Sequence, residues 1–178
     1  MNMHIILAIS VTCGLIFNFF MLIKERGDDS VKKAAWKYFS YYTNLTNILV
    51  GIWIYALIFS PSSTLGILAS NANVSAAITF YIFSVGIANY ALTGLEPHTF
   101  ANRIADLLVH AITPILTVIY WIELSDKTGL SFHLIPLWLI YLLSYALYTI
   151  THGYWSEFYP YSFTNMQELG LKRVGYRT

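Results

Sequence analysis

Charged residues are scarce in this sequence of 178 residues, and their scarcity excludes a soluble globular protein. Lys, Arg, Asp and Glu together make 11% of the chain, against roughly 25% in soluble domains. Hydrophobic residues make 57%, and the mean hydropathy is +0.57. The net charge is only +1, and the few Lys and Arg residues do not form the basic face that nucleic acid requires. The lipid bilayer is therefore the expected solvent.

Cysteine is nearly absent as well. The single thiol, Cys13, lies inside an apolar run, which excludes an internal disulfide and any metal site built on several thiolates. We expect neither a metal ion nor a cofactor. The sequence has no internal repeat and no room for a soluble domain, so we expect one membrane domain over residues 1–178 with a polar tail at 164–178.

Long apolar runs dominate what is present. A helix needs about 20 mostly apolar residues to cross a bilayer, and five segments qualify: 3–23, 34–59, 74–95, 104–122 and 133–150. The first has no positively charged leader and no small-residue cleavage site, so we expect a permanent helix and not a signal peptide. The predicted fold class is all-α, a polytopic bundle of five transmembrane helices.

The basic residues predict the orientation of this bundle. With the N-terminus outside the cell, only Lys127 falls on the outer side, and the remaining Lys and Arg residues obey the rule that positive residues stay in the cytoplasm. These cytoplasmic residues are Lys24, Arg26, Lys32, Lys33, Lys37, Arg103, Lys172, Arg173 and Arg177. We therefore expect a multi-pass protein of the cell membrane with its N-terminus outside.

Polar residues recur on one face of three predicted helices, at intervals of three and four residues. The three stripes are Ser40, Thr43, Asn44 and Asn47; Asp106, His110, Thr113 and Thr117; and Tyr141, Tyr145, Tyr148 and His152. At about 1.5 Å of rise per residue, Thr43 and His110 reach a similar depth, which His152 and Asn89 approach from the opposite end. We expect these four side chains to converge in the cytoplasmic half of the bundle.

The same residues also have purely structural interpretations. Thr and Asn side chains in membrane helices usually bond to their own helix or to a neighbouring one. Asp106 lies one turn before His110, where it can orient the imidazole as the third member of a hydrolytic triad does. It can equally lie at a helix start because the helix dipole favours a carboxylate there. The tyrosine stripe is expected to serve packing.

Three segments together resemble a known family. They are 36–47 (Trp-Lys-Tyr-Phe-Ser-Tyr-Tyr-Thr-Asn-Leu-Thr-Asn), 106–110 (Asp-Leu-Leu-Val-His) followed by Pro114, and 151–155 (Thr-His-Gly-Tyr-Trp) leading to 159–163 (Tyr-Pro-Tyr-Ser-Phe). In this order they resemble a family of small bacterial integral membrane proteins distantly similar to the androgen-induced and androgen-dependent membrane proteins of animals (the ADTRP type). The resemblance implies the bacterial plasma membrane.

The resemblance also implies an activity, that of an intramembrane threonine hydrolase acting on lipid esters. The nucleophile falls on Thr43 and the base on His110, with Ser40 and Thr46 as nucleophiles if the register is shifted. The expected supporting groups, including donors for the oxyanion, are Asn44, Asn47, Asn89, Asp106 and His152. Membrane lipids are the expected partners and a lipid-like molecule the expected substrate; oligomeric state is not indicated.

Family members continue after the 159–163 segment into a sixth hydrophobic helix. Here the sequence runs instead through Gln167, Glu168, Lys172 and Arg173 to Thr178. Either the chain is naturally short, with five helices, or its last helix is missing. In the second case, the basic tail is the cytoplasmic loop before a sixth helix, and one wall of the bundle is open to lipid.

A different class of function stays open on the residues alone. Two imidazoles on different helices, His110 and His152, can serve as axial ligands of a haem. A small transporter or a structural protein is a third interpretation, although five helices without a repeat do not show the usual two-half transporter architecture.

Overall fold

The computed structural model describes residues 2–92, 99–161 and 164–165. Over these residues the chain is helical and contains no strand. Five helices are long and apolar enough to cross a membrane: Met3–Lys24, Tyr42–Phe59, Ala72–Ala91, Phe100–Leu124 and Phe132–Ser156. The predicted all-α class with five spans is therefore confirmed, and the chain is an integral membrane protein.

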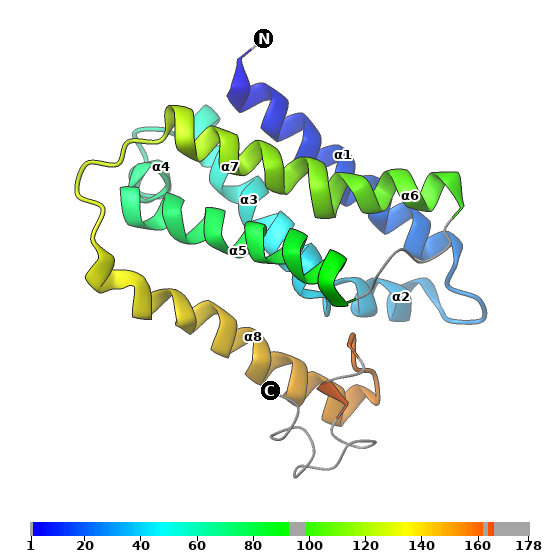
Figure 1. The fold of residues 1–178 in the computed structure, drawn as a ribbon. Helices are drawn as coiled ribbons and strands as arrows, with labels where there is room; N and C mark the ends of the chain where they lie inside the picture. Colours follow the sequence, from blue (N-terminus) through cyan, green and yellow to red (C-terminus); the bar gives the residue numbers. More distant parts are fainter. Residues whose placement is uncertain (1, 93–98, 162–163, 166–178) are drawn as a thin grey trace.

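Four of the five spans pack closely together (Figure 1). They are α1 (Met3–Lys24), α3 (Tyr42–Phe59), α5 (Ala72–Leu92) and a long span built from α6 (Phe100–Leu107), a π-helical turn η1 (Leu108–Ile112) and α7 (Thr113–Leu124). Their shared core is mainly aliphatic and includes Leu7, Val11, Val50, Ile54 and Ile82, each 0% exposed. Because this core fixes the four helices, polar residues on their inner faces are held at fixed separations.

The second predicted helix, 34–59, was wrong as a single element. The chain forms α2 (Val31–Tyr38), leaves the helix at residues 39–41, and starts α3 at Tyr42. Ser40 therefore lies in the break and not on the polar face of α3. Backbone carbonyls at such a break need partners inside a membrane, and side chains supply them: the Asn44 amide donates to the Tyr38 carbonyl over 2.9 Å, and Tyr145 donates to the Ser40 carbonyl over 2.9 Å.

The other predicted boundaries move by a few residues, and one connector gains structure. A short helix, α4 (Thr64–Ser70), lies in the connector before α5, capped by the Ser63 hydroxyl. The fourth span starts at Phe100, where Thr99 caps α6, and the fifth extends to Ser156. Predicted residues 93–95, the 162–163 end of the third resemblance segment, and the tail from 166 lie outside the described residues.

The last span, α8 (Ile135–Ser156), stands apart from the other four in Figure 1. Only Thr149, His152 and Gly153 are buried along it, and its contacts run mainly through the tyrosine stripe. The Tyr141 hydroxyl lies 3.0 Å from the Thr46 hydroxyl, and Tyr148 donates to the Phe39 carbonyl. The stripe therefore docks α8 onto the break between α2 and α3.

Candidate functional site

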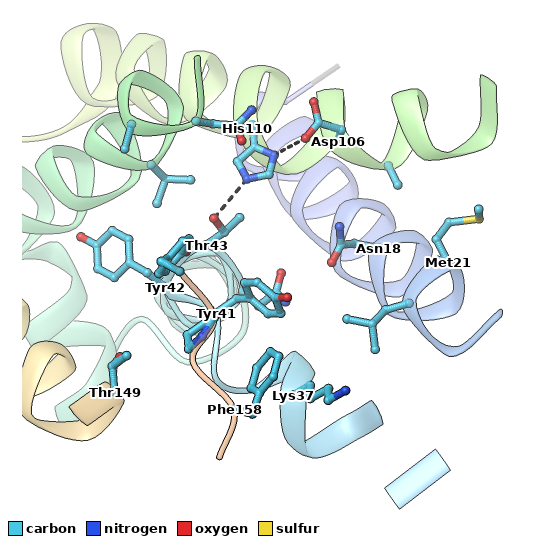
Figure 2. Close-up of a pocket in the computed structure, with 18 of the residues that line it drawn as sticks. Asn18, Met21, Lys37, Tyr41, Tyr42, Thr43, Asp106, His110, Thr149 and Phe158 are labelled. Carbon is cyan, nitrogen blue, oxygen red and sulfur yellow. Dashed lines mark hydrogen bonds and ion pairs between the residues drawn. The ribbon is translucent and has the colours of Figure 1, made fainter. Parts of the chain in front are cut away.

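A cavity of about 970 Å³ lies between α8 and the four packed spans, at the upper end of the range of roughly 300–1,000 Å³ typical of ligand sites. Thr43, Asp106 and His110 line it, together with residues of α1, α5 and α8 (Figure 2). Charged residues line its edge near the end of α1: Glu25, Arg26, Asp29 and Lys37. Under the predicted orientation, this edge is the cytoplasmic one.

Thr43 occupies the first turn of α3, directly after the break in the second segment. Its hydroxyl oxygen lies 3.1 Å from Nε2 of His110 (Figure 2), although the two residues are 67 positions apart in the chain. This is the hydrogen-bond distance at which an imidazole can take a hydroxyl proton. The structure thus brings together the two residues that the sequence placed at one depth.

Asp106 completes a chain of three groups. Its Oδ1 lies 2.7 Å from Nδ1 of His110, on the ring edge opposite Thr43, and Figure 2 shows both contacts along one line of side chains. A carboxylate at Nδ1 favours the tautomer with its proton on that nitrogen. Nε2 is then the acceptor for the Thr43 proton. The arrangement has the roles of a nucleophile, base and orienting carboxylate.

A π-helical turn presents His110 to the cavity. Residues 108–112 form this turn, and Pro114, which has no N–H, cannot donate to the carbonyl of His110 four residues earlier. Glycines on both flanking helices let the turn approach closely. A Cβ at Gly86 would lie 3.0 Å from the His110 carbonyl oxygen, and a Cβ at Gly14 would lie 3.2 Å from the Val109 side chain. The π-helical turn therefore packs closely between α1 and α5.

Two of the expected oxyanion donors are used elsewhere. The side-chain amide of Asn44 donates to the Tyr38 carbonyl. Asn47 is completely buried, and its amide donates to the carbonyls of Thr43, over 2.9 Å, and of Val109, over 3.2 Å. Asn47 therefore links the first turn of α3, which holds Thr43, to the π-helical turn, which holds His110. Asn89 does line the cavity, as the sequence predicted for its depth.

His152 does not join the other polar residues at the cavity. It is buried, its Nε2 lies 3.1 Å from the Ser40 hydroxyl, and its Nδ1 lies 3.1 Å from the Ser156 hydroxyl. Its ring stacks on Trp36. Because both ring nitrogens are engaged, ligation of a haem by His152 would require breaking one of these contacts. Among the described residues, no group of three His, Cys, Asp or Glu gathers where it could hold a metal ion.

Two cavity residues, Asn18 and Tyr161, received no functional role from the sequence. Asn18 lies on α1, four residues after Gly14, and belongs to none of the three polar stripes of the sequence. Tyr161 follows the end of α8, and neither periodicity nor depth can place a residue beyond a helix end. Burial raises the pKa of the Tyr161 phenol, an effect partly offset by hydrogen bonding with the Thr43 side chain.

The charged edge of the cavity is organised by Asp29. Its carboxylate pairs with Lys33 over 2.8 Å and with Lys37. Hydrogen bonding to these two ammonium groups lowers the pKa of Asp29, so the carboxylate is ionised at neutral pH. The Lys37 ammonium also lies 5.1 Å from the centre of the Phe158 ring. These contacts hold α2 and the segment after α8 at the cavity edge.

Comparisons of the chain with protein-family models, with curated proteins and with solved structures find no match.

Proposed function

We propose that this protein is an intramembrane hydrolase of lipid esters, in which Thr43 is the nucleophile and His110 the general base. The observation that carries the proposal is the chain Thr43, His110, Asp106 on the wall of one cavity, with contacts of 3.1 Å and 2.7 Å. Hydroxyl and imidazole groups at this separation, with the imidazole oriented from behind, are the recurring unit of acyl-transfer catalysis.

The proposed reaction has two halves. The Thr43 hydroxyl gives its proton to Nε2 of His110 while its oxygen bonds to the ester carbonyl carbon, and the carbonyl oxygen becomes an oxyanion. The intermediate collapses, the bond to the alcohol oxygen breaks, and His110 returns the proton to the departing alcohol. Water then attacks the acyl-Thr43 ester with His110 again as base. The carboxylic acid leaves, and the Thr43 hydroxyl is restored.

The surroundings of the site suit a lipid substrate. The cavity has room for an acyl chain beside Thr43, and its α8 wall includes Leu142 and Ala146. Glu25, Arg26 and Lys37 stand at its charged edge, where the polar part of a lipid and the attacking water can lie. An apolar interior with a few convergent polar groups is the usual composition of a small-molecule site.

The resemblance of residues 36–47, 106–110 and 151–163 to the ADTRP-type membrane proteins supports the same activity. We extend the proposal to membership of that family and to the bacterial plasma membrane. The alternatives of a haem protein, a transporter and a structural protein are not favoured by any particular contact in the structure. A Soret band in the spectrum of the purified protein would contradict the hydrolase proposal.

The test is hydrolysis of a p-nitrophenyl ester of a medium-chain fatty acid, together with labelling by a fluorophosphonate probe. We expect Thr43→Ala to abolish both, and Thr43→Ser to keep them, because serine retains the hydroxyl. Thr117→Ala is the matched control, since this buried hydroxyl donates to its own helix at the Thr113 carbonyl. Undiminished hydrolysis by Thr43→Ala would remove Thr43 as the nucleophile.

A further inference from the structure

A second, smaller cavity lies beyond the one that holds the proposed catalytic pair. It measures about 270 Å³ and lies between α5, α7 and α8, and its lining includes Phe80, Val118 and Trp138. We call it the apolar groove. Val118 follows His110 by eight residues along the same span, so the groove is displaced from the imidazole by about 12 Å along the bundle. The two cavities therefore follow one another along the helices.

Three tyrosines, here called the tyrosine layer, lie between the cavity and the groove. They are Tyr42 of α3, Tyr81 of α5 and Tyr141 of α8. The Tyr141 ring packs on the Tyr42 ring, with centres 5.8 Å apart, and on the Tyr81 ring, with centres 4.6 Å apart. Along α8, Tyr141 lies between Trp138, which lines the groove, and Leu142, which lines the cavity. Tyr42 itself lies on the cavity wall (Figure 2).

The hydroxyls of the tyrosine layer fix it in place. Each hydroxyl bonds to a group on a neighbouring helix, and the three bonds join α3 to α5, α8 to α3, and α5 to α8. The bonds are Tyr42 to the Ser84 hydroxyl at 3.2 Å, Tyr141 to the Thr46 hydroxyl at 3.0 Å, and Tyr81 to the Trp138 carbonyl at 2.8 Å. The layer therefore closes the space where these three helices meet.

The position of the layer limits the space beyond the proposed nucleophile. Thr46, the partner of Tyr141, lies one helical turn beyond Thr43 on α3, which is about 5 Å. The charged edge of the cavity, with Glu25 and Lys37, lies in the opposite direction. When the polar part of a lipid lies at that edge, the acyl chain of the ester runs toward the layer. A chain too long for this space must displace packed rings, which costs free energy as overpacking does.

We propose that the tyrosine layer limits the length of the acyl chain, so that the protein hydrolyses esters of short-chain and medium-chain acids in preference to long-chain esters. The inference rests on the proposed hydrolase function and deepens it by naming the class of substrate. The three tyrosines determine specificity and take no part in the bond-making steps. Tyr141 is the position to test, because its ring contacts both other members of the layer.

The first experiment compares Tyr141→Ala with the wild-type full chain on p-nitrophenyl esters of butanoic, octanoic, dodecanoic and hexadecanoic acids in one detergent. In the wild type, we expect kcat/KM to fall from the octanoate to the hexadecanoate. Removal of the Tyr141 ring joins the cavity to the groove. The hexadecanoate-to-octanoate ratio of kcat/KM should then rise by about tenfold or more, the gain from burying roughly two further methylenes. An unchanged ratio would overturn the inference, and so would a wild type that prefers the hexadecanoate.

Two controls separate the bulk of the ring from its other effects. Tyr141→Phe keeps the ring and loses the bond to Thr46, so we expect the wild-type ratio, and a raised ratio would overturn the inference. Val118→Trp, added to Tyr141→Ala, fills the groove and should return the ratio to the wild-type value. A ratio that stays raised in this double variant would also overturn it, because the long chain would then take a path outside the groove.

A second variant keeps the test informative if Tyr141→Ala lowers the melting temperature. Tyr81→Ala opens the same layer from α5 and leaves the bond between Tyr141 and Thr46 in place. We expect the same rise in the hexadecanoate-to-octanoate ratio. Partial unfolding lowers the rates for all esters alike and does not change this ratio. An unchanged ratio in Tyr81→Ala would overturn the inference.

Thr43→Ala, measured in parallel, separates this inference from the proposed function. If Thr43→Ala retains hydrolysis, the hydrolase mechanism itself is wrong. If Thr43→Ala is inactive and Tyr141→Ala keeps the wild-type preference for chain length, only the role of the tyrosine layer is wrong.

Discussion

Asp106 and His110 are four residues apart in a membrane span, and the contact of 2.7 Å between them fixes which imidazole nitrogen faces Thr43. The negative charge of the Asp106 carboxylate, 2.7 Å from Nδ1, favours the tautomer with the His110 proton on that nitrogen and leaves Nε2 free to accept. The boundary-residue interpretation of Asp106 does not account for this contact, because a helix dipole needs no partner on the imidazole. At the scale of single residues, the site therefore depends on the tautomer of one histidine.

We predict that Asp106→Asn lowers kcat for ester hydrolysis by roughly 10²- to 10⁴-fold. The asparagine amide can donate to Nδ1, which moves the imidazole proton to Nε2 and leaves no acceptor for the Thr43 hydroxyl. Asp126→Asn is the control, because Asp126 lies in the exposed loop before α8, where it accepts from the Thr128 backbone N–H. Equal kcat values for the two variants would contradict the orienting role of Asp106.

At the scale of elements, the π-helical turn η1 and the break between α2 and α3 are two irregular features of the described helices, and the proposed catalytic pair lies at both. Thr43 lies in the first turn of α3, directly after the break, and His110 lies in the π turn. Irregular backbone inside a membrane survives only where protein groups satisfy it. The Asn47 amide donates to the Thr43 carbonyl, in the first turn after the break, and to the Val109 carbonyl in the π turn, so one side chain links the turns that hold Thr43 and His110.

We predict that Gly86→Ala lowers kcat by about tenfold or more without unfolding the protein. The new Cβ would lie 3.0 Å from the His110 carbonyl oxygen, so the π turn must shift, and misplacement of a catalytic group by about 1 Å can cost 10²-fold. Gly51→Ala is the matched control, since its Cβ would meet only Val11 at 3.9 Å. Wild-type kcat in Gly86→Ala, at an unchanged melting temperature, would show that the turn tolerates displacement.

At the scale of the whole molecule, α8 acts as a separate wall that closes the cavity. Its outer face is lined with exposed Leu and Ile residues, such as Leu143 and Leu147 at 66% and 67% exposure, as suits a lipid-facing surface. Its inner face holds tyrosines whose hydroxyls bond to Thr46 of α3 and to carbonyls of the break before α3. The cavity consequently exists only in the assembled bundle, because no single pair of helices encloses it.

We predict that the loop before α8 lies outside the cell and that α2 lies in the cytoplasm, as the distribution of Lys and Arg requires. The test uses a Cys13→Ser chain carrying either Lys127→Cys or Lys33→Cys in intact cells. A membrane-impermeant maleimide should label the first variant directly and the second only after lysis. Labelling of Lys33→Cys in intact cells, with Lys127→Cys protected, would reverse the orientation and place the charged edge of the cavity outside.

The sequence by itself determined the five spans and placed Asp106 and His110 on one helix face. Both are local properties. A run of about 20 apolar residues indicates by itself a helix that crosses the membrane, and a spacing of four places two side chains on one helix face. Depth along the helices also predicted that Thr43 and His110 would meet, because the thickness of the bilayer aligns helix ends even between segments far apart in the chain.

Only the tertiary structure decided three features. They are the break at residues 39–41, the position of His152 away from the cavity, and the position of Tyr161 on the cavity wall. Tyr145 and Tyr148, more than 100 positions away in the chain, donate hydrogen bonds to carbonyls of the break. A local sequence pattern therefore does not predict the break. Its presence removes Ser40 from the α3 stripe and joins it to His152. Tyr161 reaches the cavity because Glu157 takes a left-handed conformation and the Tyr159 ring packs on Gly153, which together turn the chain back. Such a turn depends on non-local packing, which helical periodicity does not encode.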